Sequence, residues 1–200
     1  MFIRTENIQT FVRLYPIVST IVITHVICWV FFSVQTTFTN FVLEKLIGTN
    51  TYIRMGEYWR LFTPLFLHLH FGHMIINSVS LILFGPALEK MLGTYKFIIV
   101  YIWSGIFANI ATLFLLPPLY SHLGASSAIF GLFGVYSYLI VIHKNIIDRQ
   151  HTQIILTSLC IGVIMTVTNP NINTIAHTFG FLGGATIAPF IASRPNPYTI

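Results

Sequence analysis

The stretch HLHFGHMIIN, residues 68–77, places three histidines and an asparagine at the start of a long apolar run. The run predicts a helix that begins near Phe71. In that helix His73 and Asn77 are four residues apart, so they share one face. Ionisable and amide side chains are expensive within a membrane helix unless they find partners. The stretch therefore indicates a functional site at one end of a membrane-spanning helix.

The composition of the chain supports a membrane protein. Of its 200 residues 55% are hydrophobic and 8% are charged, with a mean hydropathy of +0.80, whereas an average soluble domain is about 25% charged. The basic residues give a net charge of +5, but they are scattered singly between apolar runs, which excludes a nucleic-acid-binding face.

Cys28 and Cys160 lie inside apolar runs and are interpreted as small hydrophobic residues. The first thirteen residues lack the pattern of a cleaved signal, so we expect the first apolar run to remain as an anchor.

A helix needs about 20 mostly apolar residues to cross the hydrocarbon core. Six segments meet this need and predict an all-α, polytopic membrane bundle that forms one domain over residues 1–200. These segments are 14–34, 71–88, 96–116, 126–142, 153–168 and 174–192. The piece between the first two, residues 35–70, mixes aromatic and charged residues and is expected to lie at the membrane interface.

The distribution of basic residues predicts the orientation. Cytoplasmic loops of membrane proteins carry an excess of Lys and Arg, and a cytoplasmic N-terminus satisfies this rule. The residues then placed inside are Arg4, Arg13, Lys90, Lys96, Lys144, Arg149 and Arg194, and those outside are Lys45, Arg54 and Arg60. In this orientation the second, fourth and sixth segments begin at the outer face. The compact size and the absence of a transit peptide favour a bacterial plasma membrane.

Two further clusters open the fourth and sixth segments. GASSAIFG, residues 124–131, places Ser126 at the start of a helix after a glycine. AHTFGFLGG, residues 176–184, places His177, Gly180 and Gly184 on one helical stripe. Glycines at four-residue spacing let membrane helices approach closely. Since the three clusters share one depth, Ser126 and His177 are predicted to meet.

A serine becomes a nucleophile when a base takes its proton, and a neutral imidazole does this near pH 7. The acids do not fall beside this pair: Glu6, Glu89 and Asp148 map to the inner side, and Glu44 and Glu57 to the interfacial segment. Hydrolysis would therefore use a Ser–His dyad. The amide of Ser126 at a helix start, with His73 and Asn77, can supply donors for an oxyanion.

The motifs together resemble the rhomboid family of intramembrane serine proteases. The resemblance runs from EYWR at residues 57–60, through His68, His73 and Asn77, to GPALE at 85–89, G-x-S at 124–126 and A-H-x2-G-x3-G at 176–184. It implies a six-helix bundle that needs no metal or other cofactor. It also implies that the substrates are single-pass membrane proteins, cut near the outer face after a small residue.

The resemblance assigns roles residue by residue. It implies that Ser126 attacks the peptide carbonyl, that His177 is the general base and then the acid, and that His73, Asn77 and the Ser126 amide bind the oxyanion. Phe130 matches the family's aromatic residue that stacks on this histidine. Gly124 belongs to the G-x-S motif, and Gly180 and Gly184 to the A-H-x2-G-x3-G motif. Ser127 stands where the family usually has glycine, which bears on rate and substrate preference.

Other interpretations of these residues remain open. An isolated serine in a membrane helix is usually a packing or capping residue. The histidines at 68, 70 and 73 could form a metal site, although the chain has no HExxH motif; His68 is expected instead to bond the loop backbone. A transporter or channel could place such polar groups along a path. A third alternative is an inactive rhomboid-like protein that binds membrane helices, and the oligomeric state is not indicated.

Overall fold

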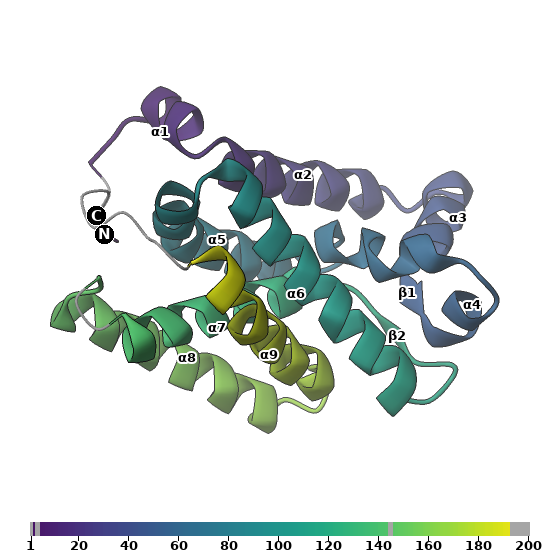
Figure 1. Cartoon of the computed structure of the whole chain (residues 1–200). Coiled ribbons are helices and arrows are strands. Elements are labelled where there is room, and N and C mark those ends of the chain that lie inside the picture. The colour runs from purple at the N-terminus through teal and green to yellow at the C-terminus, as the bar shows by residue number, and fades with distance from the viewer. Residues whose placement is uncertain (1, 3–4, 144–145, 193–200) are drawn as a thin grey trace.

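The computed structural model describes residue 2 and residues 5–143 and 146–192 (Figure 1). Arg4, Lys144 and Arg194, three of the cations in the orientation argument, lie outside the described residues. Within the described part, the long helices are α2 (Pro16–Ser33), α5 (Phe71–Leu92), α6 (Thr94–Leu115), α7 (Ser126–Ile142), α8 (Arg149–Thr168) and α9 (Thr174–Ile191). Short elements complete it: α1 (Ile8–Leu14), α3 (Thr37–Leu46), β1 (Gly48–Thr49), α4 (Asn50–Arg54), the 3-10 helices Tyr58–Leu61 and Thr63–Phe66, and β2 (Ser121–His122).

The prediction of a helical membrane bundle is confirmed. Five of the long helices are long and apolar enough to cross a membrane, and α7 is a shorter apolar helix. Some helices extend past the predicted apolar segments. Helix α8 begins at Arg149, before the predicted segment that starts at 153, because the side chain of Asp148 caps it by accepting the backbone N–H of His151. The second segment continues to Leu92. Hydropathy alone misses these polar ends.

The core of the bundle is the contact between α7 and α9, with α6 packed against both (Figure 1). Two glycines of α9 face the backbone of α7. A Cβ atom on Gly184 would lie 1.9 Å from the carbonyl oxygen of Gly131, and one on Gly180 would lie 2.1 Å from that of Ser127. The two helices therefore touch backbone to backbone. In contrast, α8 lies at the edge of the bundle and makes few contacts with α7 and α9.

The N-terminal helix α2 packs along α5 and is fixed there by a buried carboxylate. Glu89, near the end of α5, accepts the backbone N–H groups of Ile17 (2.9 Å) and Val18 (3.0 Å) at the start of α2. These amides have no partner within their own helix. Glu89 thus caps one membrane helix from another.

Residues 35–70 form short elements, all too short to span a bilayer. Arg60 is fully buried and donates to the Glu57 carboxylate and to the carbonyl oxygens of Glu44 and Ile47. Strand β1 pairs antiparallel with β2, with Gly48 opposite His122. This segment is therefore tied directly to the loop that precedes α7.

The close contact of α7 and α9 predicts the effect of one added methyl group. Gly184→Ala should destabilise the protein by about 2 kcal/mol or more, because its Cβ meets rigid backbone. Thermal or denaturant unfolding in detergent micelles measures this. The matched control is Gly72→Ala, because a Cβ on that helical glycine meets nothing within 4 Å. Equal stability of the two variants would show that the α7–α9 contact is not tight.

Candidate active site

Ser126 is the first residue of α7, and the loop before it is held in place on both sides. Gly124 has a φ of +124°, a conformation that favours glycine. A Cβ there would also lie 2.7 Å from the His73 ring. The N–H of Gly124 donates to the carbonyl of Pro64 (2.9 Å), and the N–H of Ala125 donates to His68 Nε2 (3.4 Å). The loop therefore presents Ser126 in a fixed position.

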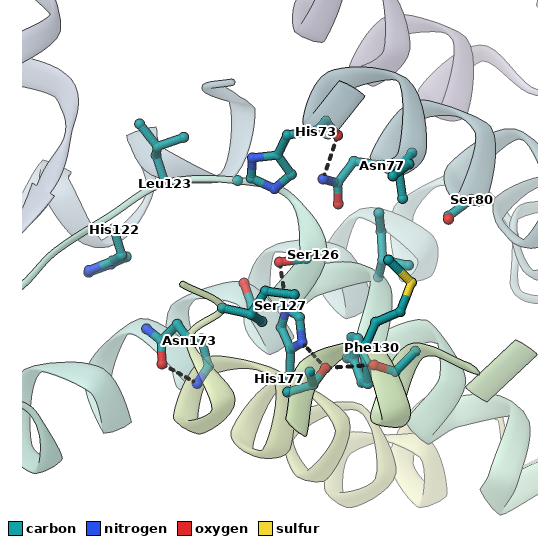
Figure 2. A pocket seen from close by; sticks show the side chains of 18 of the residues that line it. His73, Asn77, Ser80, His122, Leu123, Ser126, Ser127, Phe130, Asn173 and His177 are labelled. Atoms are coloured by element: carbon teal, nitrogen blue, oxygen red, sulfur yellow. Dashed lines mark hydrogen bonds between the residues drawn. The ribbon is translucent and has the colours of Figure 1, made fainter. Parts of the chain in front are cut away.

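His177 lies in the first turn of α9 and points at Ser126 (Figure 2). Its Nε2 is 2.7 Å from the hydroxyl oxygen of Ser126, and its side chain is buried. The Phe130 ring, one turn along α7 from Ser126, stacks on the imidazole with centroids 4.2 Å apart and planes 17° apart. The imidazole is thus fixed both in plane and in direction.

A hydroxyl not singled out from the sequence lies on the other side of this imidazole. Thr166, near the end of α8, places Oγ1 2.7 Å from Nδ1 of His177. It is one of several hydroxyl residues in α8, and their spacing does not distinguish it. Only the packing of α8 against α9 reveals the contact.

His73 and Asn77 project from α5 towards the start of α7 across the cavity (Figure 2). The Asn77 amide donates one hydrogen to the carbonyl of His73 (2.9 Å), which leaves its second hydrogen available. The N–H of Ser126, at the first helical position, has no acceptor within its own helix. The Ser126 N–H and the second hydrogen of Asn77 are therefore available to donate, and both residues line the same cavity as His73.

His68 connects this region to the rest of the bundle. It is fully buried, and its ring packs edge to face on His73 at 5.0 Å and on His25 of α2 at 4.5 Å. Burial, together with the neighbouring imidazoles of His25 and His73, strongly lowers the pKa of His68. The ring is therefore neutral at pH 7, as its acceptor role towards Ala125 requires. His25, given no role from the sequence, supports His68 through this contact.

The site borders a cavity of about 890 Å³. Its lining includes Ser126, His177, His73 and Asn77, together with apolar side chains such as Phe133. His70 is exposed. Within the described residues, no three His, Cys, Asp or Glu side chains converge to hold a metal ion. The cavity is therefore largely apolar and carries a Ser–His contact on its wall. Sites that bind small molecules commonly combine an apolar lining with a few polar groups in this way.

Fold and site together define a helical integral membrane protein with a serine hydrogen-bonded to a histidine beside a cavity. The chain belongs to the rhomboid family: the family model described as Rhomboid domain matches residues 55–194. The matched region contains every residue of the site described above, His25 excepted. The predicted family is thereby confirmed.

Named relatives include bacterial and protozoan proteins. "Putative rhomboid protease YdcA" of Bacillus subtilis (strain 168) is 47% identical over 184 residues, which cover 92% of each chain. "Rhomboid protease GluP" of the same bacterium is 34% identical over 135 residues, which cover 68% of this chain and 26% of GluP. "Rhomboid-like protease 2" of Toxoplasma gondii is 31% identical over 133 residues, which cover 66% of this chain and 47% of that protein. The similarity to YdcA thus extends over nearly the full length of both chains.

The geometry predicts which of two adjacent serines reacts with a serine-directed probe. A fluorophosphonate should label Ser126 alone, since its hydroxyl contacts His177. Ser127 is buried, and one step along a helix turns it about 100° away. Mass spectrometry of the labelled peptide identifies the site. Labelling should be lost in His177→Ala and kept in Ser127→Gly; an adduct on Ser127 would contradict the assignment.

Proposed function

We propose that this protein is an intramembrane serine protease that cleaves the transmembrane segments of single-pass membrane proteins by a Ser–His dyad. The observation that carries the proposal is the 2.7 Å contact between Ser126 Oγ and His177 Nε2, in a chain of the rhomboid family. Membership in the family alone would also fit an inactive protein that binds membrane helices. The reactive pair, in contact beside a cavity, favours the enzyme.

The reaction follows from the direction of that contact. His177 Nε2 takes the proton of Ser126 as the oxygen attacks the peptide carbonyl carbon, and a tetrahedral intermediate forms. His177 then gives this proton to the leaving amine as the C–N bond breaks. Water attacks the resulting ester as His177 takes its proton, and His177 returns this proton to Ser126 Oγ as the ester C–O bond breaks and the acid product leaves. Phe130 keeps the imidazole in plane through both steps.

The negative oxygen of the intermediate needs donors that are in place before it forms. We assign this role to the Ser126 amide, the free hydrogen of the Asn77 amide and the ring of His73, since these three residues line one cavity. Gly124 allows the His73 ring to approach, because any Cβ there would overlap the ring. His68 supports both the His73 ring and the loop before Ser126, since it contacts His73 and accepts a hydrogen bond from the Ala125 N–H. No metal or cofactor takes part in this scheme.

The surroundings of the site favour a membrane-embedded peptide as substrate. The cavity has an apolar wall that includes Phe133 of α7, next to the sparsely packed helix α8. Beneath the site, Leu81, Leu132 and Leu139 are fully buried, which disfavours a continuous polar path for transport. From the distribution of basic residues, we place the N-terminus in the cytoplasm and the site towards the outer face of the membrane. The similarity to a Bacillus subtilis protein over nearly the full chain favours a bacterial plasma membrane. From the family resemblance, we also propose that a small substrate residue precedes the cut bond.

If the protein uses a Ser–His dyad, neither residue should support cleavage without the other. Ser126→Ala and His177→Ala should each abolish cleavage of a transmembrane substrate by the purified protein, because one removes the nucleophile and the other its base. Both variants should elute and unfold like the wild type. Cleavage products are followed by gel and mass spectrometry. A folded His177→Ala protein with near wild-type turnover would refute the mechanism.

Loss of one oxyanion donor should weaken the enzyme without abolishing activity. In other hydrolases removal of one donor lowers the rate by about 10²–10³, and here the Ser126 amide and His73 remain in Asn77→Ala. We therefore expect a partial loss of kcat, measured in the same assay. Treatment with EDTA is the control for a histidine metal site. Inhibition by EDTA that zinc reverses would support that alternative.

A further inference from the structure

Thr166 lies on the side of the His177 ring that faces away from Ser126. Its Oγ1 is 2.7 Å from Nδ1, and the Ser126 oxygen is 2.7 Å from Nε2. Thr166 is 5% exposed, although its neighbours in α8 are largely exposed. The imidazole is therefore held between two hydroxyl groups, one from α7 and one from α8.

The hydrogen bonds of Thr166 determine which partner donates and which accepts between Thr166 and His177. Its hydroxyl donates to the carbonyl oxygen of Gly162, 2.6 Å away. A hydroxyl has one hydrogen, so towards His177 the Thr166 oxygen acts as the acceptor. The acceptor needs a hydrogen on Nδ1, and a neutral imidazole carries only one N–H. Nε2 is then left with a lone pair, as it must be to take the proton of Ser126.

We propose that Thr166 is a positioning residue that holds His177 in the tautomer with Nδ1 protonated and Nε2 free. This inference rests on the proposed protease function. In soluble triad hydrolases a buried acid performs this task. A charged carboxylate is costly within a membrane bundle, whereas a hydroxyl whose hydrogen is already bonded to its own helix adds no charge. Thr166 thus supplies orientation without an ion.

The backbone of α8 also packs closely against Phe130 and His177. A Cβ on Gly162 would lie 3.1 Å from the end of the Phe130 ring, so a glycine lets α8 approach the stacked pair closely. The carbonyl of this same residue receives the Thr166 hydrogen. One turn of α8, residues 162–166, therefore contacts both Phe130 and His177. The orientation of the base depends on how α8 docks.

The chain offers a matched control on the same helix. Thr168 makes the equivalent bond to Ile164 O (2.8 Å), but it is exposed and has no contact with His177. Thr166→Val keeps the shape and removes the hydroxyl, and should lower kcat about tenfold with KM changed less than about twofold. Thr166→Ser should restore kcat to within about threefold of wild type, and Thr168→Val should match wild type. An unchanged kcat in Thr166→Val, or an equal loss in Thr168→Val, would overturn the proposal.

A second measurement needs no catalysis. Nitrogen-15 NMR of the histidine-labelled resting protein in detergent, with the His177 signals identified by their loss in His177→Ala, reports which ring nitrogen carries the proton. We expect a protonated Nδ1 in the wild type and mixed tautomers in Thr166→Val. A wild-type His177 protonated at Nε2 would overturn the proposal. If Ser126→Ala keeps full activity, the protease mechanism fails, while the spectrum still tests the Thr166 contact separately.

Discussion

The backbone contact between α7 and α9 is the constraint on which the rest of the site depends. Gly180 and Gly184 leave no side chain between the two helices. Small residues of this kind are what allow close association in lipid, where the hydrophobic effect does not drive helices together. The first residue of α7 and the first turn of α9 then lie at hydrogen-bond distance. Because an error of about 1 Å in an active site can cost about 10² in rate, the proposed chemistry depends on this contact as much as the fold does.

Polar groups at the helix ends determine how the helices are positioned along their axes relative to one another. Glu89 accepts two amides at the start of α2. Asn50 donates to three carbonyl groups at the end of α6 and in the turn that follows it, and Lys96 donates to the carbonyl of Ile191 at the end of α9. Backbone groups within a bilayer must find partners inside the protein. Each of these bonds therefore satisfies a helix end and also fixes one helix against another.

The sequence was sufficient for the class of fold because six apolar runs are separated by polar stretches. It was less reliable for helix ends, where capping by a residue such as Asp148 extends a helix past its apolar part. The glycines at 180 and 184 indicated which helices meet. The roles of Ser126 and His177 remain predictions that now have a geometry. Thr166 could not be found in this way, because a threonine in a membrane helix bonds its own backbone equally well when it faces lipid, as Thr168 does.

A structure of the protein after reaction with a fluorophosphonate tests the assignment of the nucleophile and its oxyanion donors most directly. The phosphorus mimics the tetrahedral carbon, and its oxygen occupies the position of the oxyanion. We predict that this oxygen lies about 3 Å from the Ser126 amide and points towards His73 and Asn77 on α5. A phosphoryl oxygen that points away from α5, with no donor from Ser126, His73 or Asn77, would contradict the proposed site.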